Sequence, residues 1–320
     1  MHWSALGLAS VSLVWEEVVA AKVEWDLRGV VIPLITPFKD DFSVDYGGLS
    51  QLVDYYIEEM RCDGIVPCGT TGESATLSHQ EHVDVIRAVV QQNRGRVPVI
   101  ASTGSNSTRE AIELTRLAEE LGADATLQVG PYYNRPTQEG LFRHFAAIAG
   151  ATKLPIIVYN IPARTGRNIE PETIVRLWRE IPQVVGLKDA SADLRQAMAI
   201  YRSTDPATFY IYSGEDIMTL SLLCHGAAGT IAAVAHVVGR EVKAMCDAVW
   251  GGRLGEARDI HYRIMDVVDA LFVEPNPTPV KQAVEWLGLP AGPLRPPLER
   301  LTLDGQEVLR TAMRAGGWLA

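Results

Sequence analysis

The sequence predicts an α/β protein, a (β/α)8 TIM barrel followed by a small C-terminal helical domain. Three observations lead to this prediction. Short apolar runs, unalternated and often β-branched, recur eight times between residues 30 and 234, as expected for parallel strands buried on both faces. Amphipathic stretches separate these runs, and eight such units are the number that a closed barrel needs. After Gly251-Gly252 the apolar runs stop and only helical patterns continue.

The expected strands follow one another at regular intervals. They span Val30–Thr36, Gly64–Gly69, Val97–Thr103, Ala125–Gly130, Pro155–Asn160, Val184–Asp189, Phe209–Gly214 and Gly229–Val234. A doubly wound sheet is the alternative arrangement. It is disfavoured because no G-x-G-x-x-G motif follows the first strand and because the eighth unit suits closure of a barrel.

Several helix starts between the strands can be identified from their residues. Ser78 with Glu81, and Ser107 with Glu110, fit the capping box, in which side chains satisfy free N–H groups of the first turn. Pro171 stands where a first turn tolerates a missing N–H group. Each start falls between two expected strands, as the barrel requires.

The C-terminal part reads as helices at Arg253–Phe272, Pro279–Leu287 and Thr302–Ala315. The proline-rich link at 274–279 between the first two cannot be regular helix. We therefore divide the chain into a leader outside the fold (1–26), a catalytic barrel (27–252) and a helical domain (253–320). The stretch from Ala5 to Trp15 is apolar like a signal peptide, but no Lys or Arg precedes it and two glutamates follow, so secretion is not expected.

Composition excludes several classes of protein. The 320 residues carry a formal net charge of -10, which disfavours binding to nucleic acid. No run approaches the roughly 20 apolar residues of a membrane-spanning helix. The four cysteines form no C-x-x-C pair, so we expect a reduced, cytoplasmic protein in which each is a small buried hydrophobe; they are Cys62, Cys68, Cys224 and Cys246.

Polar residues at the strand ends are candidates for function, because a barrel carries its chemistry on the loops that follow its strands. The loop at 69–74 (GTTGES) has hydroxyl and N–H groups that can hold a carboxylate, although an ordinary glycine turn is equally compatible. The loop at 130–136 (GPYYNRP) carries paired tyrosines, which suit either a site or a packed aromatic corner. Tyr159 can donate or accept a proton, and Arg164 can bind a carboxylate with two hydrogen bonds.

Lys188 is the most informative residue, because it lies at the end of a strand that is expected to be buried. Burial lowers the pKa of an amine, and a neutral amine can attack a carbonyl to form a Schiff base. Pairing with the neighbouring Asp189 is the structural alternative. Lys281 is the rival lysine, but it follows the proline-rich link and begins a helix outside the barrel.

Other catalytic motifs are weak or missing. His79 and His82 have a spacing that can ligate a metal, but no third ligand at a fitting spacing appears, so no metal site is expected. Neither a G-x-S-x-G motif nor a P-loop is present.

Six motifs together carry a resemblance to a known family. They are GTTGESATL at 69–77, PYYNRP at 131–136, YNIPARTG at 159–166, GLKDAS at 186–191, SGED at 213–216 and FVEPNPTPVK at 272–281. From Leu27 to the C-terminus the chain resembles the dihydrodipicolinate (4-hydroxy-tetrahydrodipicolinate) synthases, which are lyases of the N-acetylneuraminate lyase superfamily. The resemblance implies condensation of pyruvate with L-aspartate 4-semialdehyde in diaminopimelate and lysine biosynthesis, without metal or cofactor.

The resemblance also implies a role for each matched residue. Lys188 would form the Schiff base, Tyr159 would shuttle protons, and Thr70 would link Tyr159 to Tyr133 of a neighbouring subunit. Thr71 would hold the carboxylate of pyruvate and Arg164 that of the semialdehyde, while Gly214 and Ile231 would line the pocket. A tyrosine supplied by a neighbour implies a functional dimer, and the family resemblance implies a homotetramer built as a dimer of dimers.

A second site for L-lysine as a feedback inhibitor is implied at the dimer interface. Its matched residues are Ser74, Ala75, His79, His82, Asn106, Glu110 and Tyr132. The chain departs from the family pattern at Gly130, at Asp189 and at His236, and none of these departures removes a matched catalytic group.

Two other functions remain as alternatives. One is another class I pyruvate-dependent aldolase of the same superfamily, acting on a sugar acid or on 4-hydroxy-2-oxoglutarate. Arg164 argues against it, since a lyase for long polyols has little use for a carboxylate-binding group there. The other is a barrel that binds small molecules without catalysis, which the presence of Lys188, Tyr159 and Thr70 disfavours.

Overall fold

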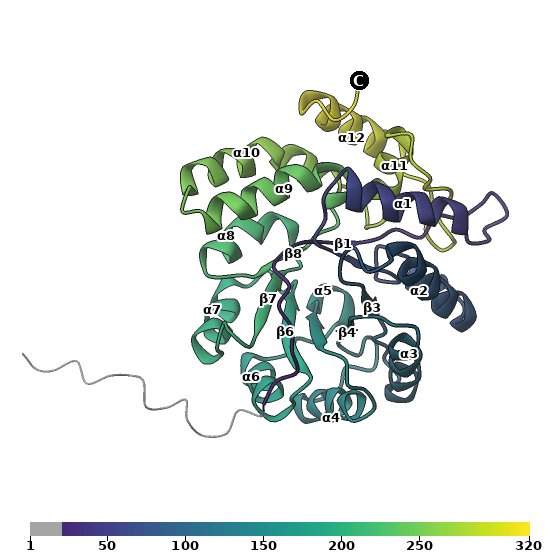
Figure 1. Ribbon diagram of the computed structural model, residues 1–320. Coiled ribbons are helices and arrows are strands. Elements are labelled where there is room, and N and C mark those ends of the chain that lie inside the picture. The colour runs from purple at the N-terminus through teal and green to yellow at the C-terminus, as the bar shows by residue number, and fades with distance from the viewer. Residues whose placement is uncertain (1–20) are drawn as a thin grey trace, which may run out of the picture.

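The computed structural model describes residues 21–320, so the signal-like stretch in the leader lies outside the described residues. Eight parallel strands form one sheet in the order β2-β1-β8-β7-β6-β5-β4-β3. A parallel bridge between Ile65 and Val99 joins the two ends of this order, so the sheet curls into a nearly closed barrel (Figure 1). The predicted (β/α)8 barrel is confirmed, and the doubly wound alternative is excluded.

Seven of the eight strands are shorter than the apolar runs that predict them, and the strand at Val184–Asp189 matches its run. They are β1 (Gly29–Pro33), β2 (Gly64–Val66), β3 (Ile100–Ser102), β4 (Ala125–Val129), β5 (Ile156–Asn160), β6 (Val184–Asp189), β7 (Tyr210–Ser213) and β8 (Gly229–Ile231). At several strands the difference arises because apolar residues continue past the strand into the buried loop at its end. After β2, for example, Cys68 is buried but adopts a φ of 56°, which no strand allows.

Helices surround the strands on the outside of the barrel (Figure 1). The barrel helices are α1 (Tyr46–Glu58), α2 (His79–Asn93), α3 (Thr108–Glu120), α4 (Gln138–Ala149), α6 (Pro171–Glu180), α7 (Leu194–Ser203), α8 (Thr219–Cys224) and α9 (Ala235–Trp250). Three short turns of helix lie on the loops after strands and were not predicted: η2 (Ser74–Thr76), α5 (Pro162–Thr165) and η3 (Asp216–Met218). These short turns bring residues of the motif loops back toward the barrel mouth.

The predicted helix starts are largely confirmed. Ser78 and Glu81 form a complete capping box, and Pro171 occupies the first turn of α6. Ser107 accepts a hydrogen bond from the backbone N–H of Glu110, but the second half of the predicted box is wrong. The Glu110 carboxylate does not turn back to the cap, because it bonds to Ser105 Oγ and His79 Nε2 instead.

The barrel interior is a separate apolar cluster enclosed by the strands. Val31, Ile100, Ile157, Tyr159 and Tyr212 contribute to it. Alternate residues of the same strands face outward and pack against the helices, as the period of two requires. Glycines at the start of β1 and β8 allow these strands to meet, since a Cβ atom on Gly229 would lie 1.9 Å from the Gly29 carbonyl oxygen.

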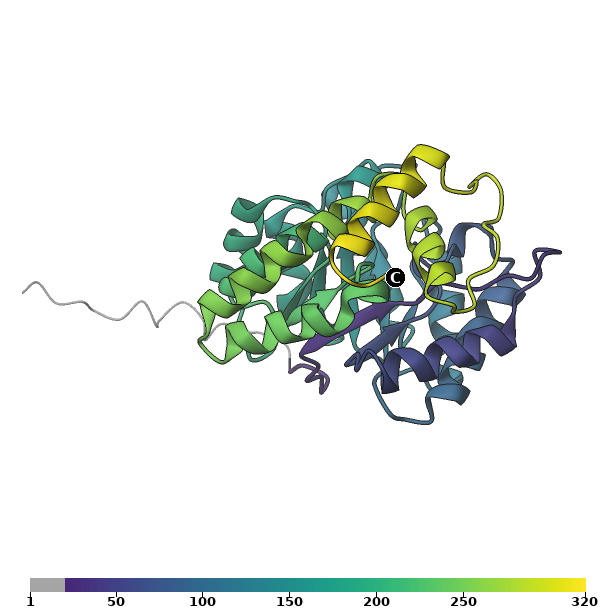
Figure 2. The same ribbon diagram turned by 90° about the horizontal axis from the view of Figure 1, so that it is seen from above.

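Three further helices follow the barrel: α10 (Leu254–Ala270), α11 (Thr278–Trp286) and α12 (Leu303–Ala315). Their bounds agree with the predicted helices to within two residues. They lie at one side of the barrel, beside α9 and α1 (Figures 1 and 2), and their apolar side chains belong to the same core cluster as those of α9. The helical C-terminal part is therefore packed closely onto the barrel.

The N-terminal end of the described chain also contacts the barrel. Lys22 Nζ donates to the Ile181 carbonyl oxygen at 2.9 Å, and Trp25 Nε1 donates to the Tyr212 hydroxyl at 3.0 Å. The predicted boundary at residue 26 remains a prediction, but the last residues before it lie against the fold.

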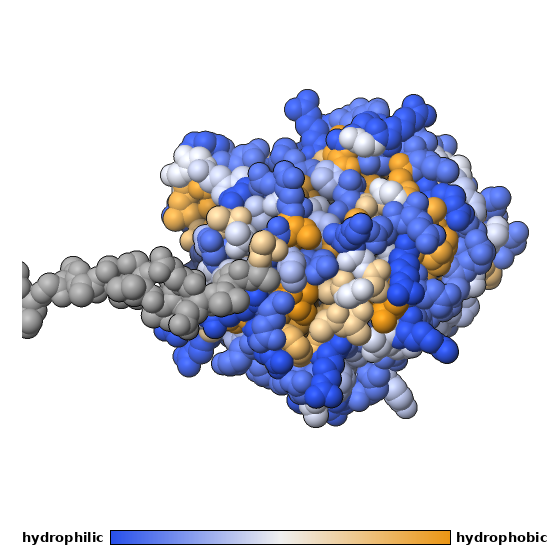
Figure 3. Space-filling model, turned by 60° about the horizontal axis from the view of Figure 1, so that its bottom comes forward, coloured by the Kyte–Doolittle hydropathy of each residue, from blue (hydrophilic) through white to orange (hydrophobic). Residues whose placement is uncertain are grey.

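The surface agrees with a folded domain without a membrane-spanning helix. On the face drawn in Figure 3, hydrophobic side chains gather in separate patches set among hydrophilic ones. Within residues 21–320, none of the helices combines the length and apolar character that crossing a membrane takes. All four cysteines are free; three are buried as predicted, but the prediction is wrong for Cys224, which is exposed at the end of α8.

Candidate active site

Lys188 lies on β6 inside the barrel and is only 6% exposed. Burial lowers the pKa of its amine to about 8, with Asp216 opposing this shift and Arg164 adding to it. Among the described residues, neither a hydrogen bond nor an ion pair holds the amine. A larger fraction of Lys188 than of an ordinary lysine is therefore neutral near physiological pH and free to act as a nucleophile.

The alternative in which Lys188 pairs with Asp189 is not what the structure shows. Successive residues of a strand point to opposite faces, so the two side chains diverge. The Asp189 carboxylate instead accepts a hydrogen bond from the Ser191 backbone N–H at 3.0 Å.

Tyr159 stands directly beside Lys188 in the sheet. The two residues are register partners on β5 and β6, and Lys188 Nζ lies 4.3 Å from the centre of the Tyr159 ring. Burial raises the pKa of Tyr159, while a hydrogen bond with the Thr70 side chain lowers it. The hydroxyl therefore keeps its proton and can deliver it to a group formed on the lysine.

The two predicted carboxylate-binding residues are joined by a third residue that the sequence analysis did not assign. Asn276 Nδ2 donates to Thr71 Oγ1 at 3.0 Å, and the backbone carbonyl oxygen of Asn276 accepts from Arg164 Nη2, also at 3.0 Å. Asn276 Oδ1 is buried without a partner. The motif FVEPNPTPVK contained the only signal for this residue: an amide side chain placed between two prolines.

Gly214 and Ile231 lie where a pocket around Lys188 requires small or apolar residues. A Cβ atom on Gly214 would stand 2.8 Å from Lys188 Cγ, so only glycine fits there without displacing the lysine. Ile231 ends β8 and belongs to the barrel interior.

Asp216, the last residue of the SGED motif at 213–216, is a second residue for which the sequence alone indicated no role. It follows β7 on the turn η3, and burial raises the pKa of its carboxyl to about 7, with the charge of Lys188 opposing the shift. Its Oδ1 atom is buried and has no hydrogen-bond partner. The site thus contains one buried acid and one buried amine that influence each other electrostatically.

The tyrosines of the loop at 131–136 point away from the barrel. Tyr133 is 91% exposed, with a φ of 70°, and Tyr132 is also exposed. Arg135 Nε holds the loop against α5 by donating to the Gly166 carbonyl oxygen at 3.0 Å. Within one chain, the structure does not bring Tyr133 to Tyr159.

The residues of the predicted lysine site gather only in part. His79 Nε2 bonds to the Glu110 carboxylate, which joins α2 to α3. His82 Nε2 lies 2.7 Å from the Ser102 carbonyl oxygen, and burial lowers the pKa of its ring. The Asn106 carbonyl oxygen accepts from Asn134 Nδ2 at 2.9 Å, next to Tyr132. Ser74 and Ala75 lie on η2, just before α2.

Of the departures from the family pattern, the one at His236 has a structural account and the one at Gly130 does not. His236 is fully buried; its Nδ1 donates to the Ala233 carbonyl oxygen at 2.8 Å and its Nε2 accepts from the Ile35 backbone N–H at 3.3 Å. Burial lowers the pKa of this ring to about 4, so it serves as a neutral link between β1 and β8. At Gly130 an added Cβ atom would lie 3.4 Å from the Ile169 side chain, which is an ordinary contact, so the space there does not require glycine.

Lys281 is as buried as Lys188 but is fully bonded. Its ammonium donates to Glu73 Oε1 at 2.8 Å and to the carbonyl oxygens of Thr36 and Pro293 at 3.1 and 2.8 Å. These three acceptors use all three donors of an ammonium group, which excludes a nucleophilic role. Across residues 21–320, no group of three or more His, Cys, Asp or Glu side chains is arranged to hold a metal ion, His79 and His82 included.

Comparison with known proteins identifies relatives over nearly the whole chain. Residues 26–315 match the dihydrodipicolinate synthetase family. The 4-hydroxy-tetrahydrodipicolinate synthase of Nitratidesulfovibrio vulgaris (strain DSM 19637 / Miyazaki F) is 47% identical over 290 residues, which are 91% of this chain and 98% of the relative.

Solved structures agree with this match. A dihydrodipicolinate synthase from Cyanidioschyzon merolae with lysine bound is 45% identical, with a TM-score of 0.89 and coverage of 92% and 99% of the two chains. A chloride-inhibited dihydrodipicolinate synthase from Acinetobacter baumannii, complexed with pyruvate, is 41% identical, with a TM-score of 0.88 and coverage of 92% and 100%.

Proposed function

Because the chain belongs to the dihydrodipicolinate synthetase family, we propose that it condenses pyruvate with L-aspartate 4-semialdehyde, the step that commits the semialdehyde to diaminopimelate and lysine. It is a lyase of the Schiff-base type. The observation that carries the proposal is the Lys188 amine, buried, unpaired and with a pKa near 8, above the ring of Tyr159. Four free cysteines suit a reducing cytoplasm as the place of this reaction.

The first half of the reaction forms the Schiff base. The lone pair of neutral Lys188 attacks the C2 carbonyl of pyruvate, and the resulting hydroxyl leaves as water after Tyr159 donates a proton to it. Thr71 binds the carboxylate of pyruvate during this step. Loss of a proton from the methyl group then gives an enamine, which is the carbon nucleophile.

The second half joins the two substrates. The enamine attacks the aldehyde carbon of the semialdehyde, whose carboxylate Arg164 binds, and the aldehyde oxygen takes up a proton. The α-amine of the same substrate then attacks the imine carbon, closes the ring and releases the lysine amine. One water is lost for each product formed, and Lys188 is regenerated. Asn276, which bonds to both Thr71 and Arg164, sets the spacing between the two carboxylate-binding residues.

The proton relay is completed by a second subunit. Tyr133 is 91% exposed on a loop whose left-handed backbone directs it outward, which suits a group that enters a neighbour's site. Thr70 would then bridge Tyr159 and the neighbour's tyrosine. We infer a dimer as the catalytic unit and a dimer of dimers as the assembly. Size-exclusion chromatography with light scattering tests this, and a monomer with full activity would contradict it.

Feedback inhibition by L-lysine is the regulatory part of the proposal. It is supported by the His79–Glu110 pair, since Glu110 suits an ammonium group and the Asn106 side chain a carboxylate. Titration with L-lysine at millimolar concentration should inhibit the enzyme, whereas D-lysine should inhibit much less. Glu110→Gln should weaken the inhibition without reducing the uninhibited rate. Absence of inhibition in the unmodified chain would contradict this part.

The substrate is decided by a coupled assay. Pyruvate and L-aspartate 4-semialdehyde should give product at a rate that falls strongly in Arg164→Ala, mainly through a higher KM for the semialdehyde. Cleavage of a sugar acid or 4-hydroxy-2-oxoglutarate at a higher kcat/KM than this condensation would instead favour the alternative aldolase.

A further inference from the structure

Residues of the C-terminal part, on α11 and after it, hold the loop that carries Thr70 and Thr71. They do so through the buried carboxylate of Glu73, two residues after Thr71. Glu73 adopts a left-handed φ of 54°, which turns its side chain away from the barrel mouth toward α11. The side chains of Glu73 and Lys281 are 1% and 2% exposed, and their atoms Oε1 and Nζ lie 2.8 Å apart. Because water does not reach this pair, burying its two charges costs desolvation free energy. We therefore looked for a function of the pair beyond stability.

Both oxygens of Glu73 are used. While Oε1 accepts from Lys281, Oε2 accepts from the Arg295 backbone N–H at 3.0 Å. Lys281 also donates to the carbonyl oxygen of Thr36, whose hydroxyl in turn donates to the Gly72 carbonyl oxygen at 2.7 Å. The loop after β2 is therefore held at two consecutive residues, directly beyond Thr71.

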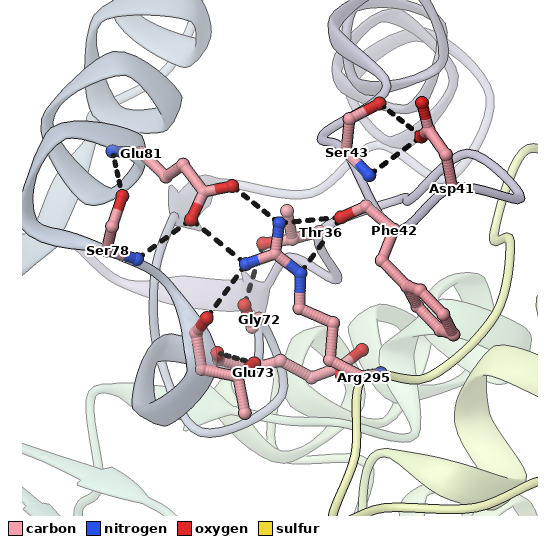
Figure 4. Close-up of polar contacts among 10 residues, drawn as sticks. Thr36, Asp41, Phe42, Ser43, Gly72, Glu73, Ser78, Glu81 and Arg295 are labelled. Carbon is pink, nitrogen blue, oxygen red and sulfur yellow. Dashed lines mark hydrogen bonds and ion pairs between the residues drawn. The ribbon is translucent and has the colours of Figure 1, made fainter.

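The Arg295 guanidinium extends this network to α2 and to the loop after β1. Figure 4 shows it between the Glu81 carboxylate on one side and the Phe42 carbonyl oxygen on the other. Arg295 also donates to the Thr76 carbonyl oxygen at 2.8 Å, at the end of η2. The ring of Phe38 contacts both cations, with its centre 4.5 Å from Lys281 Nζ and 4.2 Å from Arg295 Cζ.

We propose that Glu73, Lys281, Arg295 and Glu81, together called the Glu73 clamp, are positioning residues that fix Thr70 and Thr71 against Tyr159 and pyruvate. The expected effect on the KM for pyruvate rests on the proposed function, whereas the expected effect on the mobility of the loop does not. It gives α11 and the segment after it a part in catalysis: Asn276 holds Thr71 by its hydroxyl, and the Glu73 clamp holds the backbone beyond it.

The mechanism of the clamp is restraint of a loop rich in glycine. Gly69 and Gly72 flank the two threonines, and glycine gives a backbone more freedom than any other residue. Without the clamp, the threonine hydroxyls would sample more positions. A misplacement of 1 Å costs catalysis about 100-fold, so even a partial release should be visible in kcat/KM.

The test compares Lys281→Met with a matched control, Lys243→Met. Lys243 also forms a 2.8 Å ion pair, with Asp63, but at the opposite end of β2. Lys281→Met should raise the KM for pyruvate about 10-fold or more and speed hydrogen exchange of the amides at 69–77. Lys243→Met should lower stability without either effect. Equal kinetic losses in the two variants, or an unchanged KM and exchange rate in Lys281→Met, would overturn the proposal.

A second variant covers the case in which a lone buried carboxylate prevents folding. The double variant Glu73→Gln/Lys281→Met removes both charges, so no unpaired charge remains in the interior. We expect it to fold with near-normal stability and still to show the raised KM. If it recovers both stability and KM, the pair is only structural and the proposal fails. Hydrogen exchange reports on the clamp without substrate, so failure of the wild-type chain to bind pyruvate would reject the proposed function and not the clamp.

Discussion

Gly214→Ala should slow Schiff-base formation without unfolding the protein. The added Cβ atom would stand 2.8 Å from Lys188 Cγ, 3.0 Å from Lys188 Cε and 3.1 Å from Ala190 Cβ, whereas ordinary contact begins at 3.4 Å. The lysine must therefore retreat by roughly 0.6 Å at Cγ, the difference between 3.4 and 2.8 Å. Because φ at Gly214 lies outside the left-handed range, the backbone itself accepts alanine.

The magnitude follows from this displacement. If 1 Å of misplacement costs about 100-fold, a shift of about half an ångström costs roughly 10-fold in the rate of adduct formation. Overpacking should also lower the free energy of unfolding by about 1–3 kcal/mol. The effect on rate is expected mainly in the attack on pyruvate, because the displaced atoms are those of the nucleophile.

The assay traps the imine with borohydride and follows the intact mass over time at a subsaturating concentration of pyruvate. Gly255→Ala is the matched control, since a Cβ atom there meets nothing within 4 Å, and in helix α10 the change should be neutral or stabilising. Adduct formation in Gly214→Ala at the wild-type rate would show that the absence of a side chain at this position does not place the lysine. So would an equal slowing in Gly255→Ala.

Three further predictions concern charge and assembly. The rate of adduct formation should rise with pH and reach half its maximum near pH 8, because Lys188 reacts as the neutral amine. Asp216→Asn should lower this midpoint, because the Asp216 carboxylate raises the pKa of Lys188. A midpoint above pH 10 would contradict this. Tyr133→Phe and Lys188→Ala should each be nearly inactive alone but recover activity when co-expressed, since one site of each mixed dimer is then complete; no recovery would contradict a tyrosine supplied by the neighbour. Arg295 lowers the pKa of Glu81 from 4.5 to about 2, so its stabilisation is complete above pH 4.5 and is lost as the pH falls through 2. Glu81→Gln should therefore reduce the free energy of unfolding at pH 7 by an amount on the order of 1 kcal/mol, after screening by solvent, and by much less at pH 2. Urea titrations at the two pH values measure this, and an equal loss at both would contradict it.

The sequence predicted the barrel well because its strands are buried on both faces. A run such as Val184–Asp189 lacks the amphipathic pattern of a helix, so it is not mistaken for one. In the structure all six of its residues belong to the strand and all six are buried. Strand lengths were overestimated where buried loops continue the apolar pattern, as at Cys68. Short helical turns such as α5 were missed because four residues give no periodicity to detect.

The candidate site was predictable where a residue type was out of place and was not where contacts decide the role. A lysine at the end of a buried strand is unusual in any sequence, so Lys188 stood out. Lys281 is equally buried, and only its three acceptors show that it is bonded rather than reactive. Asn276 was missed because its two partners lie 112 and 205 residues away, a separation that no local pattern reveals.

The electrostatic properties of the site could not be predicted from the sequence for the same reason. Asp216 follows a strand like many other acidic residues, and its raised pKa comes from burial beside Lys188, which only the closed barrel creates. The Ser107 cap shows the converse case. A local motif predicted a capping box, but the histidine on the neighbouring helix and Ser105 bind the carboxylate instead.

The proposed mechanism requires that one buried lysine acts as the nucleophile toward pyruvate. It is tested most directly by incubating the protein with pyruvate and borohydride and locating the adduct by peptide mass spectrometry. We expect a single pyruvate-derived adduct on Lys188, which Lys188→Ala abolishes. An adduct on Lys281 or on any other lysine, or no adduct at saturating pyruvate, would contradict it.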